Sequence, residues 1–175
     1  MMTLVLATRN AHKAREIQGV LGAGPGYLSL RDFPDAPPVI EDAPTFAANA
    51  AKKARSLAQW LSTRPRPPGA LFTVADDSGL EVDALNGAPG VHSARFAWLG
   101  VGAAANAGAD GNANSKARAK AHLNASDAEN NAKLLRLLGS IAAPDRTARF
   151  RCVIAAVEVP PALPRLASQT APAPL

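Results

Sequence analysis

The chain has 175 residues, of which 47% are hydrophobic and 19% charged, enough apolar material for the core of one domain. No apolar run approaches the roughly 20 residues of a membrane span, and a single cysteine excludes an internal disulfide. A net charge of +5 suits polyanionic ligands, but an aromatic content of 5% argues against a base-stacking surface for single-stranded nucleic acid. We expect no membrane or nucleic-acid partner and, without a basic signal-like N-terminus, a cytoplasmic location.

The N-terminal segment predicts a strand, a short polar loop and a helix. Residues 4–7 form an apolar run typical of a buried strand, and residues 11–21 carry apolar side chains at helical spacing. Asn10 suits the N-cap of that helix. A helix N-terminus offers free N–H groups and a positive dipole end to an anion, with Lys13 in the first turn. The segment is therefore either a phosphate site or a capped helix with a solvated lysine.

The next segment contains the clearest helix of the sequence. Residues 27–30 predict a short strand, and Thr45 opens a helix with one apolar stripe at helical spacing. The stripe consists of Phe46, Ala50, Ala54, Leu57 and Leu61. Polar residues, among them Asn49 and Lys53, are expected to lie outside the stripe.

Two adjacent carboxylates follow the apolar run of residues 71–75, which predicts a buried strand. Asp76 and Asp77 repel each other unless a cation or a proton relieves the repulsion. Because side chains alternate along a strand, we expect the two to point to opposite faces, one of them into a cleft. Ser78 adds a donor, and Gly79 would allow a tight turn. The group is either an acidic turn or a divalent-metal site with a general base at the strand's carboxyl end.

The second half of the chain is less regular. Residues 92–96 suit a strand or a loop, and residues 100–124 read as a poorly ordered insertion with some helix at 115–122. Ser126 and Glu129 have the spacing of a capping box. They open a helix through residue 138, with three leucines expected inward: Leu134, Leu135 and Leu138.

The C-terminal region predicts one more strand and then a change of composition. Residues 147–157 alternate and then become continuously apolar, which suits a strand that enters the core. Beyond them, repeated prolines exclude a helix or an interior strand. We therefore expect a domain of residues 1–158 and a disordered, Pro/Ala-rich tail of residues 159–175.

Five motifs in this order resemble the inosine-triphosphate pyrophosphatases, a family that hydrolyses non-canonical purine nucleoside triphosphates. The longest and most specific block is residues 75–95; the others lie within 7–13, 45–54, 130–135 and 148–153, and together they span most of residues 3–157. The resemblance implies an α/β fold with a mixed central sheet flanked by helices, and two lobes with a central cleft.

The resemblance also implies an activity and a set of site residues. The activity is Mg²⁺-dependent hydrolysis of ITP, dITP and XTP to the monophosphate and pyrophosphate, by a homodimer that cleans the nucleotide pool. Asp77 is implied as the catalytic base and, with Glu41, as the metal ligand. The implied substrate-binding residues are Thr8, Arg9, Asn10, Ala11, His12, Lys13, Lys53 and Ser78.

The chain departs from the family's pattern at several places. Arg9 and Pro44 stand where the family has glycines, and Ala48 stands where it has a glutamate. After residue 157 the family's Phe-Gly-Tyr-Asp-type loop, a lysine and a Ser-His-Arg motif are missing, so we expect a chain truncated at its C-terminus.

Two alternative functions follow from these features. The first is a catalytically weak or inactive nucleotide-binding remnant of the same family. The second is a basic nucleic-acid-binding protein carried by Lys116, Arg118, Lys120 and an arginine group, although such charges more often lie on solvated faces. The arginine group consists of Arg146, Arg149 and Arg151.

Overall fold

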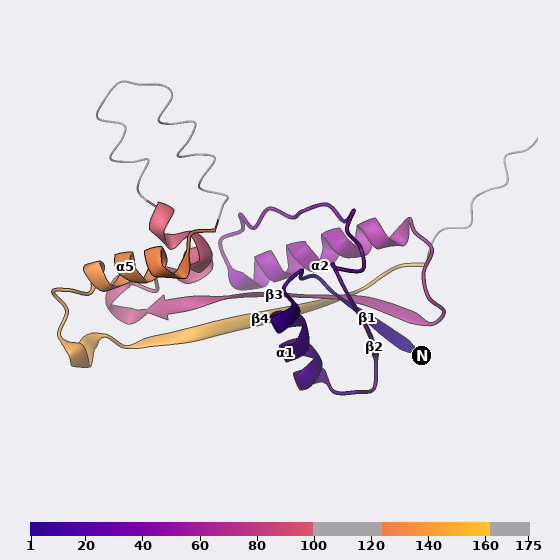
Figure 1. The fold of residues 1–175 in the computed structure, drawn as a ribbon, viewed down its shortest axis with the longest axis horizontal. Coiled ribbons are helices and arrows are strands. Elements are labelled where there is room, and N and C mark those ends of the chain that lie inside the picture. Colours follow the sequence, from indigo (N-terminus) through magenta and orange to yellow (C-terminus); the bar gives the residue numbers. More distant parts are fainter. Residues whose placement is uncertain (100–123, 162–175) are drawn as a thin grey trace, which may run out of the picture.

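The computed structural model describes residues 1–99 and 124–161, which form a mixed four-stranded sheet in the order β2-β1-β3-β4 (Figure 1). Strands β1 (Met2–Leu6), β2 (Gly26–Ser29) and β3 (Ala70–Val82) are parallel. Strand β4 (Ala148–Glu158) is antiparallel to β3. The α/β class with a mixed central sheet is confirmed, and the two predicted strands at 27–30 and 147–157 are each displaced by one residue. Strand β4 is an edge strand of the described sheet with no buried residue, so the prediction that it enters the core is wrong.

The two longest N-terminal helices cover opposite faces of the sheet, α1 (Ala11–Leu21) on one and α2 (Phe46–Ser62) on the other (Figure 1). Side chains alternate along β3, so some of them face α1 and the others face α2. Leu71 packs with the apolar side chains of α2, while Val74 packs with Ile17 of α1. Odd-numbered residues of β3 therefore face α2, and even-numbered residues face α1.

Helix α2 has the predicted N-cap and the predicted buried stripe. The Thr45 hydroxyl accepts the Ala48 N–H at 3.1 Å, and all five stripe residues are buried. Asn49 is also fully buried, so the buried face of α2 is wider than the predicted apolar stripe. A helix that packs on a sheet buries a sector at least about 100° wide, which takes in the position beside Ala50.

Strand β3 does not end where the apolar run ends but continues to Val82, so the two aspartates lie inside it rather than in a turn. The reason is β4, which supplies backbone partners from Phe72 to Val82, whereas β1 pairs only with residues 70–74. Asp76 and Asp77 thus lie where β1 leaves β3. They therefore lie beside the carboxyl end of β1 and not at the carboxyl end of their own strand.

The distal halves of β3 and β4 carry a second group of elements: η1 (Asp83–Leu85), η2 (Gly90–Trp98), α5 (Asp127–Leu137) and η3 (Ala143–Asp145). Residues 92–96 belong to the 3₁₀ helix η2, so the predicted strand or loop is wrong there. Local sequence could not show that η2 folds back onto β3, where the Ser93 hydroxyl accepts the Leu80 N–H.

Helix α5 begins at the predicted capping box, in which Ser126 and Glu129 bond reciprocally. Leu138 is buried as expected, but Leu135 is 63% exposed, so its inward placement is wrong. The helix packs on η2, and the exposure of Leu135 places it outside the buried part of that contact.

The ordered chain continues past β4 for a few residues. Val159 is fully buried, and its N–H donates to the Leu71 carbonyl at 2.8 Å. The predictions for residues 100–123, and for the tail from residue 162 onward, lie outside the described residues. In the part of the chain that the structure describes, no helix is both long and apolar enough to cross a membrane.

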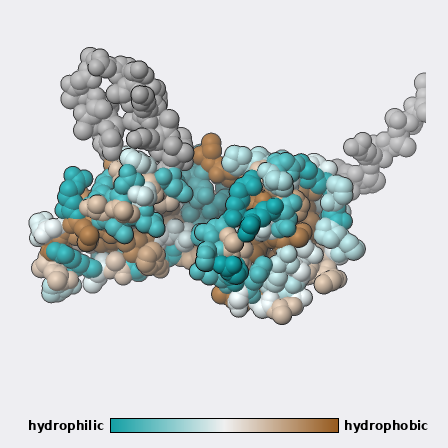
Figure 2. Space-filling model, in the orientation of Figure 1, coloured by the Kyte–Doolittle hydropathy of each residue, from teal (hydrophilic) through white to brown (hydrophobic). Residues whose placement is uncertain are grey.

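The elements form two lobes along the β3–β4 pair, one with α1, α2, β1 and β2, the other with η2 and α5 (Figure 1). Figure 2 shows the surface hollowed between these lobes. The long strand pair is the continuous connection between them, so it determines where the cleft lies.

Gly79 provides a test of how β3 and η2 pack. A Cβ at this position would lie 2.5 Å from both the Gly90 carbonyl oxygen and the Ser93 hydroxyl, so the glycine serves close packing and not the expected tight turn. We expect Gly79→Ala to lower the free energy of unfolding by about 1–3 kcal/mol.

The matched control is Gly19→Ala in α1, where nothing lies within 4 Å of the added Cβ. This variant should gain about 0.5–1 kcal/mol, because alanine is the better helix former. Urea unfolding of both variants makes the comparison, and equal stabilities would contradict the packing argument.

Candidate active site

A hollow of about 340 Å³ opens between the two lobes. Five residues expected at the site line it: Lys13, Glu41, Lys53, Asp77 and Ser78. The second lobe contributes Val91, Ala94, Arg95 and Asn124. The hollow is the central cleft that the resemblance implied, and it gathers residues from six separate parts of the chain.

Asp77 is the buried acid of this hollow, with a side chain 8% exposed. Its Oδ2 accepts a hydrogen bond from Asn49 Nδ2 at 3.0 Å, and its Oδ1 lies 4.0 Å from Lys53 Nζ. Burial raises the pKa of Asp77, while the Asn49 hydrogen bond and the Lys53 charge lower it, and Glu41 raises it further. A carboxyl group with a raised pKa in a cleft suits the role of a general base.

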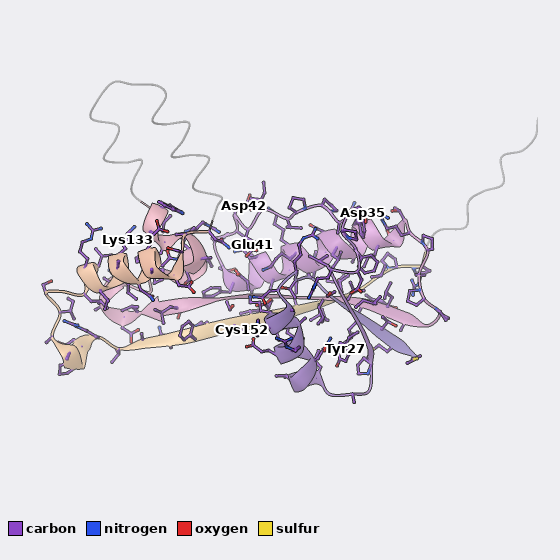
Figure 3. The ribbon with its side chains drawn as sticks, in the orientation of Figure 1. Tyr27, Asp35, Glu41, Asp42, Lys133 and Cys152 are labelled. Carbon is purple, nitrogen blue, oxygen red and sulfur yellow. The ribbon has the colours of Figure 1, made fainter. Side chains whose placement is uncertain are left out.

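Glu41 lies on the segment that precedes α2, on the α2 side of the β3–β4 pair (Figure 3). Its Oε2 is 3.2 Å from Lys53 Nζ, so one partly buried ammonium group lies beside both carboxylates. The Glu41 backbone carbonyl accepts a hydrogen bond from Arg95 Nη2 at 2.6 Å. Arg95 therefore fastens this segment of the first lobe to the second lobe.

The donor set of Glu41 and Asp77 fits a small hard cation. Mg²⁺ prefers oxygen ligands and is commonly held by one or two carboxylates, with water and phosphate oxygens completing its shell. Among residues 1–99 and 124–161, no three His, Cys, Asp or Glu side chains gather into a metal-binding group. The two carboxylates thus suit a cation shared with a phosphate ligand better than a closed protein site.

Asp76 points to the opposite face of β3, as strand alternation predicted. Its Oδ2 lies 2.6 Å from Lys13 Nζ, and its side chain is 10% exposed. Lys13 also lines the hollow that contains Asp77. Its ammonium group therefore lies at the border between the two faces, already paired with a buried carboxylate.

The loop before α1 is held by its own hydrogen bonds. Asn10 Oδ1 accepts the N–H groups of His12 at 2.9 Å and Lys13 at 3.4 Å, which confirms the predicted N-cap. The Thr8 hydroxyl accepts the Asn10 N–H. Part of the anion-binding capacity of the helix N-terminus is thus used by the cap.

Arg9 is held away from the hollow by backbone groups of the next segment. Its guanidinium donates to the carbonyls of Leu30 at 3.2 Å and Ala36 at 2.9 Å. His12 Nδ1 lies 3.0 Å from the Arg15 guanidinium, and Ala11 is the first residue of α1. Residues 8–12 do not line the hollow around Asp77, and their roles toward a substrate stay predictions.

Two residues at the site had no role assigned from sequence. Asn49 bonds Asp77, and Arg95 bonds the Glu41 backbone. For Asn49 a signal existed, because a polar residue beside the apolar stripe of a helix must find hydrogen-bond partners if it is buried. For Arg95, nothing in the spacing of residues along the sequence indicated a contact with the Glu41 segment.

The arginines considered for nucleic-acid binding are engaged within the protein. Arg149 forms ion pairs with Glu81 at 2.9 Å and Asp83 at 2.8 Å, and Arg151 pairs with the same Glu81. Arg146 donates to the Ile141 carbonyl. Two of the three cations are thus neutralised locally, which argues against a phosphate-binding stripe.

The Lys13–Asp76 pair yields a prediction about stability. Lys13→Met leaves the Asp76 carboxylate buried without its cation, which we expect to cost about 1–3 kcal/mol. Asp76→Asn should cost less, because Lys13 is 40% exposed and remains solvated. The double variant should recover part of the loss in a double-mutant cycle of urea unfolding. Purely additive losses would show that the pair contributes no coupling.

Comparison with known proteins identifies the chain's relatives. The Ham1 family model matches residues 4–167. The dITP/XTP pyrophosphatase of Geobacter sulfurreducens is 46% identical over 156 residues, which cover 89% of this chain and 62% of the relative. That of Desulforamulus reducens is 43% identical, with 90% and 63% covered. The chain thus spans 62–63% of the length of these two relatives.

Solved structures agree with this assignment. The HAM1 protein from Coxiella burnetii is 34% identical with a TM-score of 0.63, and the match covers 91% of this chain and 64% of that one. The Staphylococcus aureus Ham1 protein is 32% identical with a TM-score of 0.61, with 89% and 62% covered. The resemblance seen in the sequence motifs is confirmed, and the chain belongs to the Ham1 family.

Proposed function

We propose that the chain hydrolyses non-canonical purine nucleoside triphosphates, namely dITP, ITP and XTP, to the monophosphate and pyrophosphate. Relatives at 43–46% identity carry the name dITP/XTP pyrophosphatase. The observation that carries the proposal is the hollow between the lobes, where the carboxylates Glu41 and Asp77 and the cations Lys13 and Lys53 line one space.

Hydrolysis at the α-phosphorus needs an activated water and neutralisation of the triphosphate charge. Asp77 is proposed as the base, since it is buried in the hollow and its pKa is raised by that burial. Lys13 and Lys53 are proposed to bind phosphate oxygens, and Ser78 to contact the nucleotide. Thr8 and Asn10 are also proposed to bind the substrate, at the N-terminus of α1. The adjoining residues Arg9, Ala11 and His12 are proposed for the same role.

Glu41 and Asp77 are proposed to hold Mg²⁺. When bound, the cation supplies charge neutralisation at the phosphate oxygens. Lys53, whose side chain is 14% exposed, lies beside both carboxylates and limits their mutual repulsion. A homodimer and a cytoplasmic location are further proposals, and light scattering on the purified chain tests the first of them.

Strand alternation separates the two aspartates in function. We expect Asp77→Asn to lower pyrophosphate release from dITP with Mg²⁺ by at least about a hundredfold, since it removes the proposed general base. Asp76→Asn is the matched control: it changes the neighbouring carboxylate, which faces α1, and should cost much less. Equal losses in two folded variants would contradict the assignment. A folded parent chain without pyrophosphate release would instead support the weak or inactive remnant.

Lys53 tests the phosphate contact. Lys53→Met should raise the KM for dITP, because a cation that lines the hollow is removed. Lys52→Met is the control on the same helix, since Lys52 pairs with the exposed Asp42 at 2.5 Å and does not line the hollow. Steady-state kinetics at saturating Mg²⁺ compare the two, and a KM equal to that of the parent in both variants would remove Lys53 from the phosphate site.

A further inference from the structure

Asn49 links the two segments that carry the proposed metal ligands. It is 0% exposed, on the face of α2 that packs against β3. Its Oδ1 accepts the Ala43 N–H at 2.9 Å, and its Nδ2 donates to Asp77 Oδ2 at 3.0 Å and to the Ala43 carbonyl at 3.4 Å. One side chain therefore contacts both β3 and the segment that contains Glu41.

The chemistry of an amide suits this position. The Ala43 N–H requires an acceptor, while the Asp77 carboxylate and the Ala43 carbonyl require donors. An asparagine presents the acceptor on one side and both donors on the other, so its orientation is fixed by its partners. An aspartate would face Asp77 with a second negative charge, and a leucine of similar size would satisfy neither segment.

For Asp77 the amide limits which oxygen lone pairs remain free. Oδ2 receives the Asn49 hydrogen bond, and Oδ1 receives the Ser78 N–H at 3.1 Å. With both oxygens held, the carboxylate has a defined rotation about its Cβ–Cγ bond. The remaining lone pairs are those available to a ligand in the hollow, which Asp77 lines.

For Glu41 the same amide fixes the backbone two residues further along, at Ala43. On the other side, Arg95 holds the Glu41 carbonyl at 2.6 Å. The Glu41 backbone is thus fastened to α2 through Asn49 and to η2 through Arg95. A shift of Ala43 would move Glu41 relative to Asp77.

We propose that Asn49 is a positioning residue that holds the carboxylates of Glu41 and Asp77 in register for a shared divalent cation. The inference rests on the proposed function, because it takes the two carboxylates as the cation's ligands. Residues that orient metal ligands typically change metal affinity by about 10- to 100-fold when they are removed. Asn49 should therefore influence the cation without touching the nucleotide.

The test compares Asn49→Leu with Thr73→Val. Thr73 is a matched control, because it is fully buried in the same α2–β3 interface and its hydroxyl lies 2.8 Å from the Ala54 carbonyl, away from Glu41 and Asp77. Mn²⁺ serves as the probe, with free Mn²⁺ counted by electron paramagnetic resonance in the absence of nucleotide. The binding lost in Asp77→Asn defines the signal from this site. Circular dichroism melts select a temperature at which every variant is folded.

We expect Asn49→Leu to weaken Mn²⁺ binding at this site by about 10- to 100-fold. In turnover of dITP it should lower kcat at saturating nucleotide and raise the Mg²⁺ concentration needed for half-maximal rate. Thr73→Val should lower the melting temperature and leave Mn²⁺ affinity unchanged. If Asn49→Leu does not fold, Asn49→Ser, which removes the same amide with a smaller side chain, takes its place.

Unchanged Mn²⁺ affinity in a folded Asn49 variant would overturn the inference, and so would an equal loss in Thr73→Val. The proposed function fails separately, through absence of pyrophosphate release by the parent chain. In that case the Mn²⁺ titration, which needs no turnover, still decides the role of Asn49.

Discussion

Around Asp76 and Asp77, strand β3 is buried on both faces, and its two-residue alternation assigns each functional group to one side of the sheet. Asp77 faces α2 and meets Lys53 and Asn49, while Asp76 faces α1 and meets Lys13. Both assignments follow from the same register with β4. A slip by one residue would exchange the two carboxylates between the faces and separate each from its partners. The register of one strand pair is therefore the constraint on which the site depends.

Burial of two neighbouring carboxylates is unfavourable, since each loses its hydration. The fold offsets this cost by giving each acid its own partners. Lys13 is 2.6 Å from Asp76, whereas Asp77 has an amide donor at 3.0 Å and a more distant ammonium group at 4.0 Å. Asp76 is thus closely neutralised, and Asp77 is only partly so. This difference favours Asp77, and not Asp76, as the carboxylate that binds a cation or a proton.

The position of the hollow follows from strand pairing. Strand β1 accompanies β3 only as far as Val74, and beyond that point β3 continues with β4 into the second lobe. The segment that carries Glu41 and the start of η2 meet at this divergence, beside Lys13 of α1. Arg95 and Asn49 connect them through backbone carbonyl and amide groups. The site is therefore assembled at the junction of the lobes, from segments that have no local relationship in the sequence.

The sequence by itself determined the local elements and the family. Several predicted features depend on interactions over a few residues, and the structure has them. They are the helix caps at Asn10, Thr45 and Ser126, the apolar stripe of α2, and the opposite directions of Asp76 and Asp77. Only the tertiary structure decided where β3 ends, that Asn49 is buried and that Lys13 pairs with Asp76. The physical reason is that the interacting groups are far apart in the sequence. Strand β4, which extends β3, follows it by more than sixty residues, and Asp76 is also more than sixty residues from Lys13. Periodicity predicts which way a side chain points along its own element, but the group it meets is set by the packing of distant segments.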